Sequence, residues 1–261
     1  MPDKITAPKI RAMREKGERI VCLTAYDAVF GEMADSAGVD LILVGDSVGN
    51  TTLGYSSTVP VTLEEMLHHT RATHRGVKRA LLVGDLPFGT YQASPEQALL
   101  SSIALIKAGA EAVKLEGEYT DAIKAITKAG IPVMGHLGMT PQSVHQFGGH
   151  KVQGKGSRGE ALIESAKAVE DAGAFAVVLE LIPAELAQRI TAAIAIPTIG
   201  IGAGAGCSGQ IQVLHDVLGL TRQSFRHARQ YADGYRCLLG AMEQYTDEVR
   251  TGTFPDAEHS F

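Results

Sequence analysis

Short apolar runs alternate with longer amphipathic segments along most of the chain. Several of these runs end in Gly followed by a polar residue, as in LILVGDSVGN at residues 41–50. Such a run predicts a strand that is buried on both faces, and the helical spacing of apolar residues between the runs predicts helices. Strands are therefore expected at residues 20–25, 40–46, 80–85, 112–117, 132–138, 175–181 and 197–204, with 211–219 as the best candidate for an eighth.

Helices are expected before, between and after these strands. Ser94 has the position of an N-cap, and Pro95 then occupies the first position of the helix. Residues 50–62 are poor in helix formers and form a connection longer than the usual length of about 2 to 6 residues, which is typical of functional loops. The expected helices lie at 9–18, 28–37, 63–76, 95–110, one ending near 130, 161–173, 183–194 and about 225–251.

The order of these elements predicts the fold class. In KAGAEAVKLEG, KAGIPVMGH and EDAGAFAVVLE, Ala-Gly ends a helix and the next strand begins within a few residues. This alternation indicates a parallel sheet. Seven or eight such units in 261 residues fit a (β/α)8 barrel better than an open doubly wound sheet of about five or six strands. We expect an α/β protein with a single (β/α)8 TIM barrel domain over residues 1–261, an N-terminal helical segment and a C-terminal helical extension.

Composition and charge exclude several classes of partner. The net charge is −5 without a long block of one sign, which disfavours a nucleic-acid surface or a polybasic membrane patch and favours a small-molecule partner. Cys22, Cys207 and Cys237 have neither the spacing of a zinc site nor the density of a disulfide scaffold, so a cytoplasmic location is expected. We expect no targeting segment, and no apolar run approaches the roughly 20 residues of a membrane span.

Polar residues interrupt the apolar strands near their C-terminal ends. In a (β/α)8 barrel these ends form the active site, so five strands would contribute to one mouth. Any one of these residues alone could instead be a helix cap or part of a loop ion pair. The residues are Asp46, Asp85, Lys114 with Glu116, His136 and Glu180.

Asp46 and Asp85 each follow Gly at the end of a strand and are candidate metal ligands. Two hard oxygen donors without a nearby His or Cys favour Mg²⁺ over zinc or copper. Glu116 is a candidate third ligand, directly or through water. The alternative is that the two aspartates are helix caps.

The strand AVKLEG places Lys114 and Glu116 on one face and Val113 on the other, because side chains alternate along a strand. Lys114 either forms a buried salt bridge with Glu116 or neutralises a carboxylate substrate. Glu180 ends an otherwise apolar strand and is a candidate general base, or a cap for the helix that begins near residue 183.

Two Gly-rich segments raise the alternative of a nucleotide or phosphate site. The run GIGAGAG at 200–206 satisfies a permissive dinucleotide spacing, but it lies late in the chain and no acidic residue stands about 20 positions further on. In GHKVQGKG at 149–156, Gly occupies the Ser/Thr position of a P-loop, which excludes a nucleoside triphosphatase of that type. A non-catalytic barrel that binds a phosphorylated ligand at 200–206 remains an alternative.

With these motifs placed, the chain resembles the ketopantoate hydroxymethyltransferase family, also called 3-methyl-2-oxobutanoate hydroxymethyltransferase. The resemblance extends from the first strand to the C-terminal FPDAEHSF. It rests on the segments TAYDA, LVGDSVGN, PVTLEEMLHHT, GDLPFGTY, AVKLEG, PVMGHLGMTPQS, KVQGK and IPTIGIGAG.

The resemblance implies an enzyme of pantothenate and coenzyme A biosynthesis that transfers a hydroxymethyl group from 5,10-methylenetetrahydrofolate to 3-methyl-2-oxobutanoate with Mg²⁺, as a homodecamer. It implies that Asp46 and Asp85 bind the metal, with Glu116 in its coordination sphere or outer shell. Ser47 and Lys114 would contact the oxo acid, and His136 the substrate or product hydroxyl. Glu180 would accept the proton, although LELIP stands where the family commonly has LECVP.

The nearest rival is a Mg²⁺-dependent, enolate-forming carbon-carbon lyase or mutase of the isocitrate lyase and phosphoenolpyruvate mutase type. Those enzymes usually carry a Cys in an active-site loop. The loop GGHKVQGKG has none, which favours the transferase.

Overall fold

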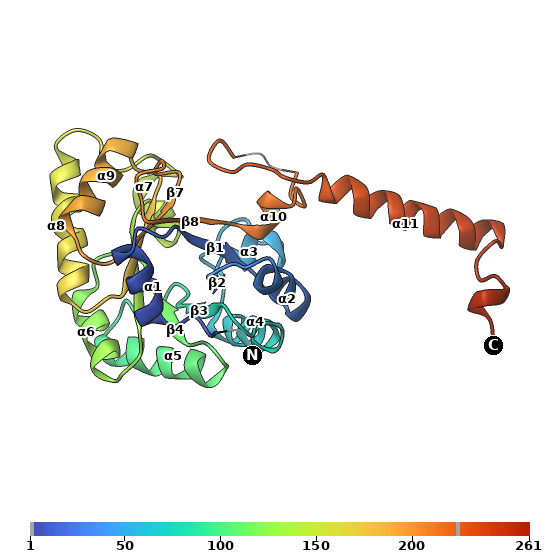
Figure 1. Cartoon of the computed structure of the whole chain (residues 1–261), viewed down its shortest axis with the longest axis horizontal. Helices are drawn as coiled ribbons and strands as arrows, with labels where there is room; N and C mark the ends of the chain where they lie inside the picture. The colour runs from blue at the N-terminus through green and yellow to red at the C-terminus, as the bar shows by residue number, and fades with distance from the viewer. Residues whose placement is uncertain (1–2, 223–224) are drawn as a thin grey trace. The chain divides into compact units, whose positions relative to one another are not determined.

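Parallel strands form the centre of the molecule and pair edge to edge in chain order. The computed structural model describes residues 3–222 and 225–261. Within the first of these ranges eight strands close into a barrel, because β8 also pairs with β1 (Figure 1). The predicted (β/α)8 fold is therefore confirmed. The strands are β1 (Ile20–Thr24), β2 (Leu41–Val44), β3 (Leu81–Asp85), β4 (Ala112–Lys114), β5 (Val133–Gly138), β6 (Ala176–Glu180), β7 (Thr198–Ile201) and β8 (Gly209–Gln212).

Helices connect the strands from β1 to β7 and surround the barrel (Figure 1), whereas residues 202–208 join β7 to β8 without a helix. Ser94 accepts a hydrogen bond from Gln97 N and Pro95 opens its helix, as the sequence predicts. A capping box of Thr62 and Glu65 likewise starts the helix that follows the long loop after β2. The helices are α1 (Ala7–Glu15), α2 (Ala28–Ser36), α3 (Val48–Thr51), α4 (Leu63–Gly76), α5 (Pro95–Lys107), α6 (Thr120–Lys128), η1 (Pro141–Ser143), α7 (Val144–Phe147), α8 (Arg158–Asp171), α9 (Ala184–Ala193), α10 (Leu214–Val217), α11 (Gly234–Thr251) and η2 (Ala257–His259).

Alternate residues of β2, β4 and β6 belong to two separate apolar clusters. Ile42, Val113 and Val177 pack outward against the helices. The other cluster fills the barrel interior and includes Leu41, Leu43, Leu81, Val83, Ala112, Met134, Ala176 and Val178. Because alternation continues along a strand, the interior series continues at the C-terminal strand ends with Asp85, Lys114, His136 and Glu180. Asp46 instead lies beyond the last residue of β2.

Helix α1 closes the N-terminal end of the barrel. Its apolar residues Ile10 and Met13 belong to the interior cluster. The main chain of Ile5 bonds Arg79 just before β3, and the Arg14 guanidinium donates to carbonyls at the end of α9 and just before β7. Helix α1 therefore covers the end of the barrel opposite the polar strand ends.

Replacing Ile10 by Ala tests this closure. Ile10 is fully buried, so Ile10→Ala is expected to lower the free energy of unfolding by about 2–5 kcal/mol through lost apolar contact and a cavity. Urea unfolding of both proteins measures the change. Arg11→Ala on the exposed side of α1 is the matched control, with an expected change within about 0.5 kcal/mol. Equal midpoints for Ile10→Ala and the parent protein would contradict a structural role for α1.

The observed elements differ from the predicted ones at a few positions. The eighth strand begins at Gly209, where a Cβ would meet Ile20 O at 2.3 Å, and it ends before Leu214; residues 214–217 form α10 instead. Helix α11 begins at Gly234 rather than near residue 225, and α1 begins at Ala7 after its N-cap Thr6. The long loop after β2 contains the short helix α3.

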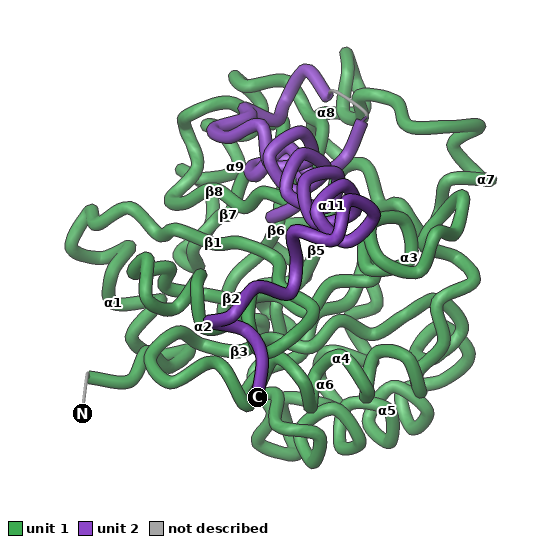
Figure 2. The backbone as a smooth tube through the Cα atoms, turned by 90° about the vertical axis from the view of Figure 1, so that its right-hand side faces the viewer, with its two compact units in different colours: residues 1–213 green, residues 214–261 purple. Residues whose placement is uncertain are grey.

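The chain divides into two compact units, Met1–Val213 and Leu214–Phe261 (Figure 2). The first unit contains the entire barrel, and the second contains α10, α11 and η2. The sequence-based view of one domain with a helical extension stays a prediction. None of the helices in the described ranges combines the length and apolar character needed to cross a membrane.

Candidate active site

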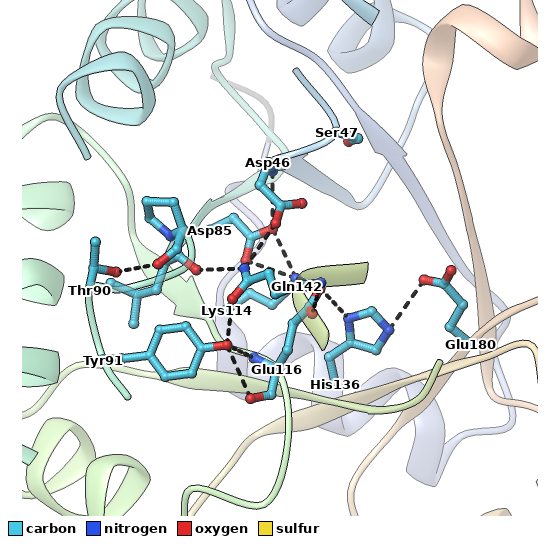
Figure 3. Close-up of polar contacts among 12 residues, drawn as sticks. Asp46, Ser47, Asp85, Thr90, Tyr91, Lys114, Glu116, His136, Gln142 and Glu180 are labelled. Atoms are coloured by element: carbon cyan, nitrogen blue, oxygen red, sulfur yellow. Dashed lines mark hydrogen bonds and ion pairs between the residues drawn. The ribbon is translucent and has the colours of Figure 1, made fainter. Parts of the chain in front are cut away.

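Polar side chains from five strands meet at the C-terminal end of the barrel. Figure 3 shows Asp46 and Asp85 at one end of this cluster and Glu180 at the other, with Glu116 and His136 between them. Four of these side chains are almost fully buried, whereas the Glu180 side chain is 15% exposed. The strand ends thus bring together the residues that the sequence pattern selects.

The closest ion pair in the cluster joins neighbouring strands. Lys114 Nζ lies 2.8 Å from Asp85 Oδ1 and 2.9 Å from Asp85 Oδ2, and the two residues are direct partners in the β3–β4 register. Burial alone would lower the pKa of Lys114, but Asp85, Glu116 and Asp46 outweigh it and raise that pKa. Lys114 is therefore held as a cation among carboxylates.

Glu116 lies beyond the end of β4 and contacts two cations. Its Oε1 is 3.6 Å from Lys114 Nζ and 3.3 Å from His136 Nδ1, and its Oε2 accepts a hydrogen bond from the main-chain N of Gln142 at 3.0 Å. Burial raises its pKa, but Lys114 and His136 outweigh burial and the net shift is downward. Glu116 is thus an ionised carboxylate in the interior of the site.

His136 bridges Glu116 and the candidate base Glu180. Its Nε2 lies 3.3 Å from Glu180 Oε2, and neither ring nitrogen makes a hydrogen bond of normal geometry within the described ranges. Burial lowers the pKa of His136, but the two carboxylates outweigh it and raise the pKa to about 9. At neutral pH the ring is an imidazolium whose two N–H groups face Glu116 and Glu180. Helix α9 shows no side-chain cap at its N-terminus, which disfavours the alternative that Glu180 caps it.

The main chain around Glu180 is held on both sides. Its carbonyl accepts from Met139 N at 2.8 Å, and Gly138 has φ +95°, at a point where a Cβ would meet that carbonyl at 2.3 Å. Leu181 has φ 46°, a left-handed conformation that costs a non-glycine residue about 1–3 kcal/mol. Leu181 N donates to Ile201 O, and Leu181 O accepts from Gln153 N. These contacts fix the direction in which the Glu180 side chain leaves its strand.

Asp46 joins the cluster through its main chain and its carboxylate. Its main-chain N donates to Asp85 Oδ2 at 3.2 Å, and its Oδ2 accepts from Gln142 Nε2 at 2.9 Å. Burial, Asp85 and Glu116 together raise its pKa well above the usual range. Asp46 is thus the carboxylate whose negative charge is least compensated here.

Ser47 lies at the edge of the cluster. Its Oγ is 2.8 Å from the hydroxyl of Tyr26, a side chain buried to 1% exposure whose pKa burial raises to about 12. Among the described residues no contact of Ser47 with Lys114 or His136 is observed. Tyr26 is therefore the residue that orients the Ser47 hydroxyl.

Gln142 and Tyr91 are parts of this site that strand-end reasoning misses. Both follow strands: Tyr91 lies in the loop after β3, and Gln142 lies in the short helix η1 after β5. Both side chains are almost fully buried. The Tyr91 hydroxyl donates to Gln142 Oε1 at 2.7 Å and accepts from Glu116 N at 3.2 Å. The one available signal is position, because each follows a predicted strand within a few residues.

The donor set of this cluster fits a hard divalent cation. Asp46, Asp85 and Glu116 supply oxygen donors, the type that Mg²⁺ prefers. Within the described residues no three His, Cys, Asp or Glu side chains converge as a complete metal site, and both Asp85 oxygens contact Lys114. Mg²⁺ commonly uses one or two carboxylates and completes its octahedron with water and substrate oxygens. The raised pKa of Asp46 also indicates an excess of negative charge that a cation would relieve.

Comparison with known proteins places the sequence in one family. A family model described as "Ketopantoate hydroxymethyltransferase" matches residues 4–257. A protein of Syntrophus aciditrophicus (strain SB) is 54% identical over 263 residues, which cover 99% of this chain and 97% of that protein. A protein of Chloroflexus aurantiacus (strain ATCC 29366 / DSM 635 / J-10-fl) is 56% identical over 262 residues, with 98% and 92% covered. Both are named 3-methyl-2-oxobutanoate hydroxymethyltransferase.

Two solved structures with a similar fold are those of other enzymes. A phosphonopyruvate hydrolase in complex with oxalate and Mg²⁺ has a TM-score of 0.63 at 14% identity, with 98% of this chain and 93% of that chain covered. A 2,3-dimethylmalate lyase of the PEP mutase/isocitrate lyase superfamily has a TM-score of 0.62 at 18% identity, with 97% and 91% covered. At these identities the likeness concerns the fold alone.

Proposed function

Because the chain belongs to the ketopantoate hydroxymethyltransferase family and is a hydroxymethyltransferase, we propose that its substrates are 3-methyl-2-oxobutanoate, 5,10-methylenetetrahydrofolate and water. The proposed products are ketopantoate and tetrahydrofolate, and the proposed pathway is the synthesis of pantothenate and coenzyme A. The proposal includes dependence on Mg²⁺. The observation that carries it is the buried cluster of Asp46, Asp85, Lys114, Glu116, His136 and Glu180 at the barrel mouth.

The reaction needs a base, a charge-stabilising group and a group that positions the oxo acid. Glu180 is proposed to accept the proton from C3 of the oxo acid, because it is the most exposed carboxylate of the cluster and its backbone is held on both sides. Lys114 is proposed to neutralise the substrate carboxylate, and Ser47, held by Tyr26, to position the oxo acid. Water would release the methylene carbon of the folate at the oxidation level of formaldehyde, with tetrahydrofolate as the leaving group. The carbanionic C3 would then attack that carbon, and its oxygen would take the proton that Glu180 accepted and become the product hydroxyl.

Asp46 and Asp85 are the proposed holders of Mg²⁺, with Glu116 as a ligand directly or through water. When bound, Mg²⁺ would supply the positive charge that stabilises the enolate form of a 2-oxo acid. His136 keeps its imidazolium between Glu116 and Glu180, which places an N–H donor beside the proposed base. This donor suits the hydroxyl of the product.

The test of this function separates its two half-reactions. With Mg²⁺ and without folate, the purified protein is expected to exchange the C3 proton of 3-methyl-2-oxobutanoate for deuterium in D₂O, as measured by NMR. With 5,10-methylenetetrahydrofolate it is expected to form ketopantoate. Absence of both reactions would refute the proposal. Proton exchange followed by carbon-carbon cleavage of another 2-oxo acid would favour the lyase alternative. The similarity to the solved lyase and hydrolase structures concerns the fold and does not by itself support that alternative. A cytoplasmic location and a homo-oligomeric assembly, a homodecamer by resemblance, stay predictions.

A further inference from the structure

The side chain of Gln142 occupies the centre of the carboxylate cluster. It comes from η1, after β5, and contacts residues that follow two other strands. Its Nε2 donates to Asp46 Oδ2 at 2.9 Å and to Leu86 O at 3.0 Å. Its Oε1 accepts from the Tyr91 hydroxyl at 2.7 Å and from Gln92 Nε2 at 3.3 Å (Figure 3). The amide therefore uses both of its N–H groups and both acceptor positions of its oxygen.

The chemistry of these partners sets the orientation of the amide. Leu86 O can only accept a hydrogen bond, so the nitrogen of the amide must face it and the neighbouring Asp46 Oδ2. The Tyr91 hydroxyl accepts from Glu116 N, and its own hydrogen is directed to Gln142 Oε1, the shorter of its two acceptor contacts. A rotated amide would place its oxygen against two acceptors and its nitrogen against the donated hydrogen. The amide thus has one favourable orientation.

One carboxylate oxygen of Asp46 is occupied by this arrangement and the other is not. Oδ2 accepts the Gln142 hydrogen bond, whereas Oδ1 accepts none from the residues that the structure describes. The main-chain N of Gln142 also holds Glu116 Oε2 at 3.0 Å. The same residue therefore orients two of the carboxylates assigned to the metal site.

We propose that Gln142 is a positioning residue that holds Asp46 so that Oδ1 faces the cation, and that Tyr91 aims the Gln142 amide. This inference rests on the proposed function, because it concerns the affinity of the same site for Mg²⁺. Partners that orient a metal ligand typically contribute a factor of about 10 to 100 in metal affinity or activity. Gln142 is expected to act through Asp46 and not by touching the substrate.

The test compares Mg²⁺ binding by variants of the full chain. Gln142→Met keeps the length of the side chain and the main-chain bond to Glu116 but removes the amide. It is expected to weaken Mg²⁺ binding about 10-fold or more by isothermal titration calorimetry without substrate. Turnover is expected to recover as Mg²⁺ approaches saturation. Tyr91→Phe is expected to weaken binding in the same direction by a smaller factor. Gln244→Met, which makes the same change at an exposed glutamine of α11, is the matched control and is expected to bind Mg²⁺ like the parent.

The Mg²⁺ dissociation constant decides the outcome. If Gln142→Met and Tyr91→Phe melt at lower temperature but bind Mg²⁺ as the parent does, Gln142 supports only the fold and the inference is wrong. If Gln142→Met does not fold, Tyr91→Phe alone is decisive by the same criterion. If the parent protein itself neither binds Mg²⁺ nor exchanges the C3 proton, the proposed function fails. If the parent does both and the variants bind equally well, only this inference fails.

Discussion

Glu180→Gln is expected to reduce exchange of the C3 proton of 3-methyl-2-oxobutanoate by about 10²–10⁴-fold, the usual contribution of a general base. Glutamine has nearly the same shape but cannot accept the proton. The contact with His136 at 3.3 Å can be kept by the amide oxygen, so binding of the oxo acid should change little. NMR measurement of deuterium incorporation at C3, together with a binding titration of the oxo acid, separates the two effects.

The control for this substitution is Glu185→Gln. Glu185 is an exposed acidic residue in the first turn of α9, five positions from the proposed base. Its replacement changes the charge by the same amount and should leave proton exchange at the parent rate. Exchange retained in Glu180→Gln would assign proton removal to another group of the cluster.

Asp46→Ala and Asp85→Ala are each expected to remove most Mg²⁺-dependent turnover, by at least about 100-fold, but with different effects on stability. Removal of Asp85 leaves the buried Lys114 with its next carboxylate 3.6 Å away, so a loss of about 3–5 kcal/mol of unfolding free energy is expected. Removal of Asp46 takes away a carboxylate whose raised pKa marks unfavourable surroundings, so little stability should be lost. Mg²⁺ titrations of turnover and urea unfolding measure both quantities.

Asp121→Ala serves as the control for both aspartates, because Asp121 is an exposed acidic residue at the start of α6. Its turnover and Mg²⁺ dependence are expected to match those of the parent. Full Mg²⁺-dependent turnover in Asp46→Ala or Asp85→Ala would exclude that residue from the metal site.

The barrel and most of the cluster could be predicted because both depend on local patterns. Apolar runs mark the strands, and a charged residue at the end of such a run, such as Asp85 or Glu180, stands out in the sequence. The eighth strand was placed imperfectly. Its burial alternates and is incomplete over Gly209–Gln212, so it lacks the continuous apolar run by which the other strands are identified.

The partner of Lys114 shows why contacts between strands are harder to predict. From the sequence, one of the two alternatives for Lys114 is a salt bridge with Glu116, two positions away on the same face; the other is a contact with a carboxylate substrate. The closest partner is Asp85, which the β3–β4 register sets beside Lys114. Register depends on how two strands align and cannot be read from either one. The pairing of Gln142 with Tyr91 cannot be predicted for a related reason. Both side chains are neutral, and they lie 51 positions apart and come into contact only in the folded chain.

The closure of the barrel by α1 has a consequence for the order of events in the proposed reaction. With the interior filled by apolar side chains and α1 across the N-terminal end, we expect both substrates and both products to reach and leave the polar cluster from the C-terminal end of the barrel. The small oxo acid would reach the buried Lys114 and Asp85 only before the larger folate covers them. Steady-state kinetics should therefore show compulsory order: the oxo acid binds first, and ketopantoate leaves only after tetrahydrofolate has departed.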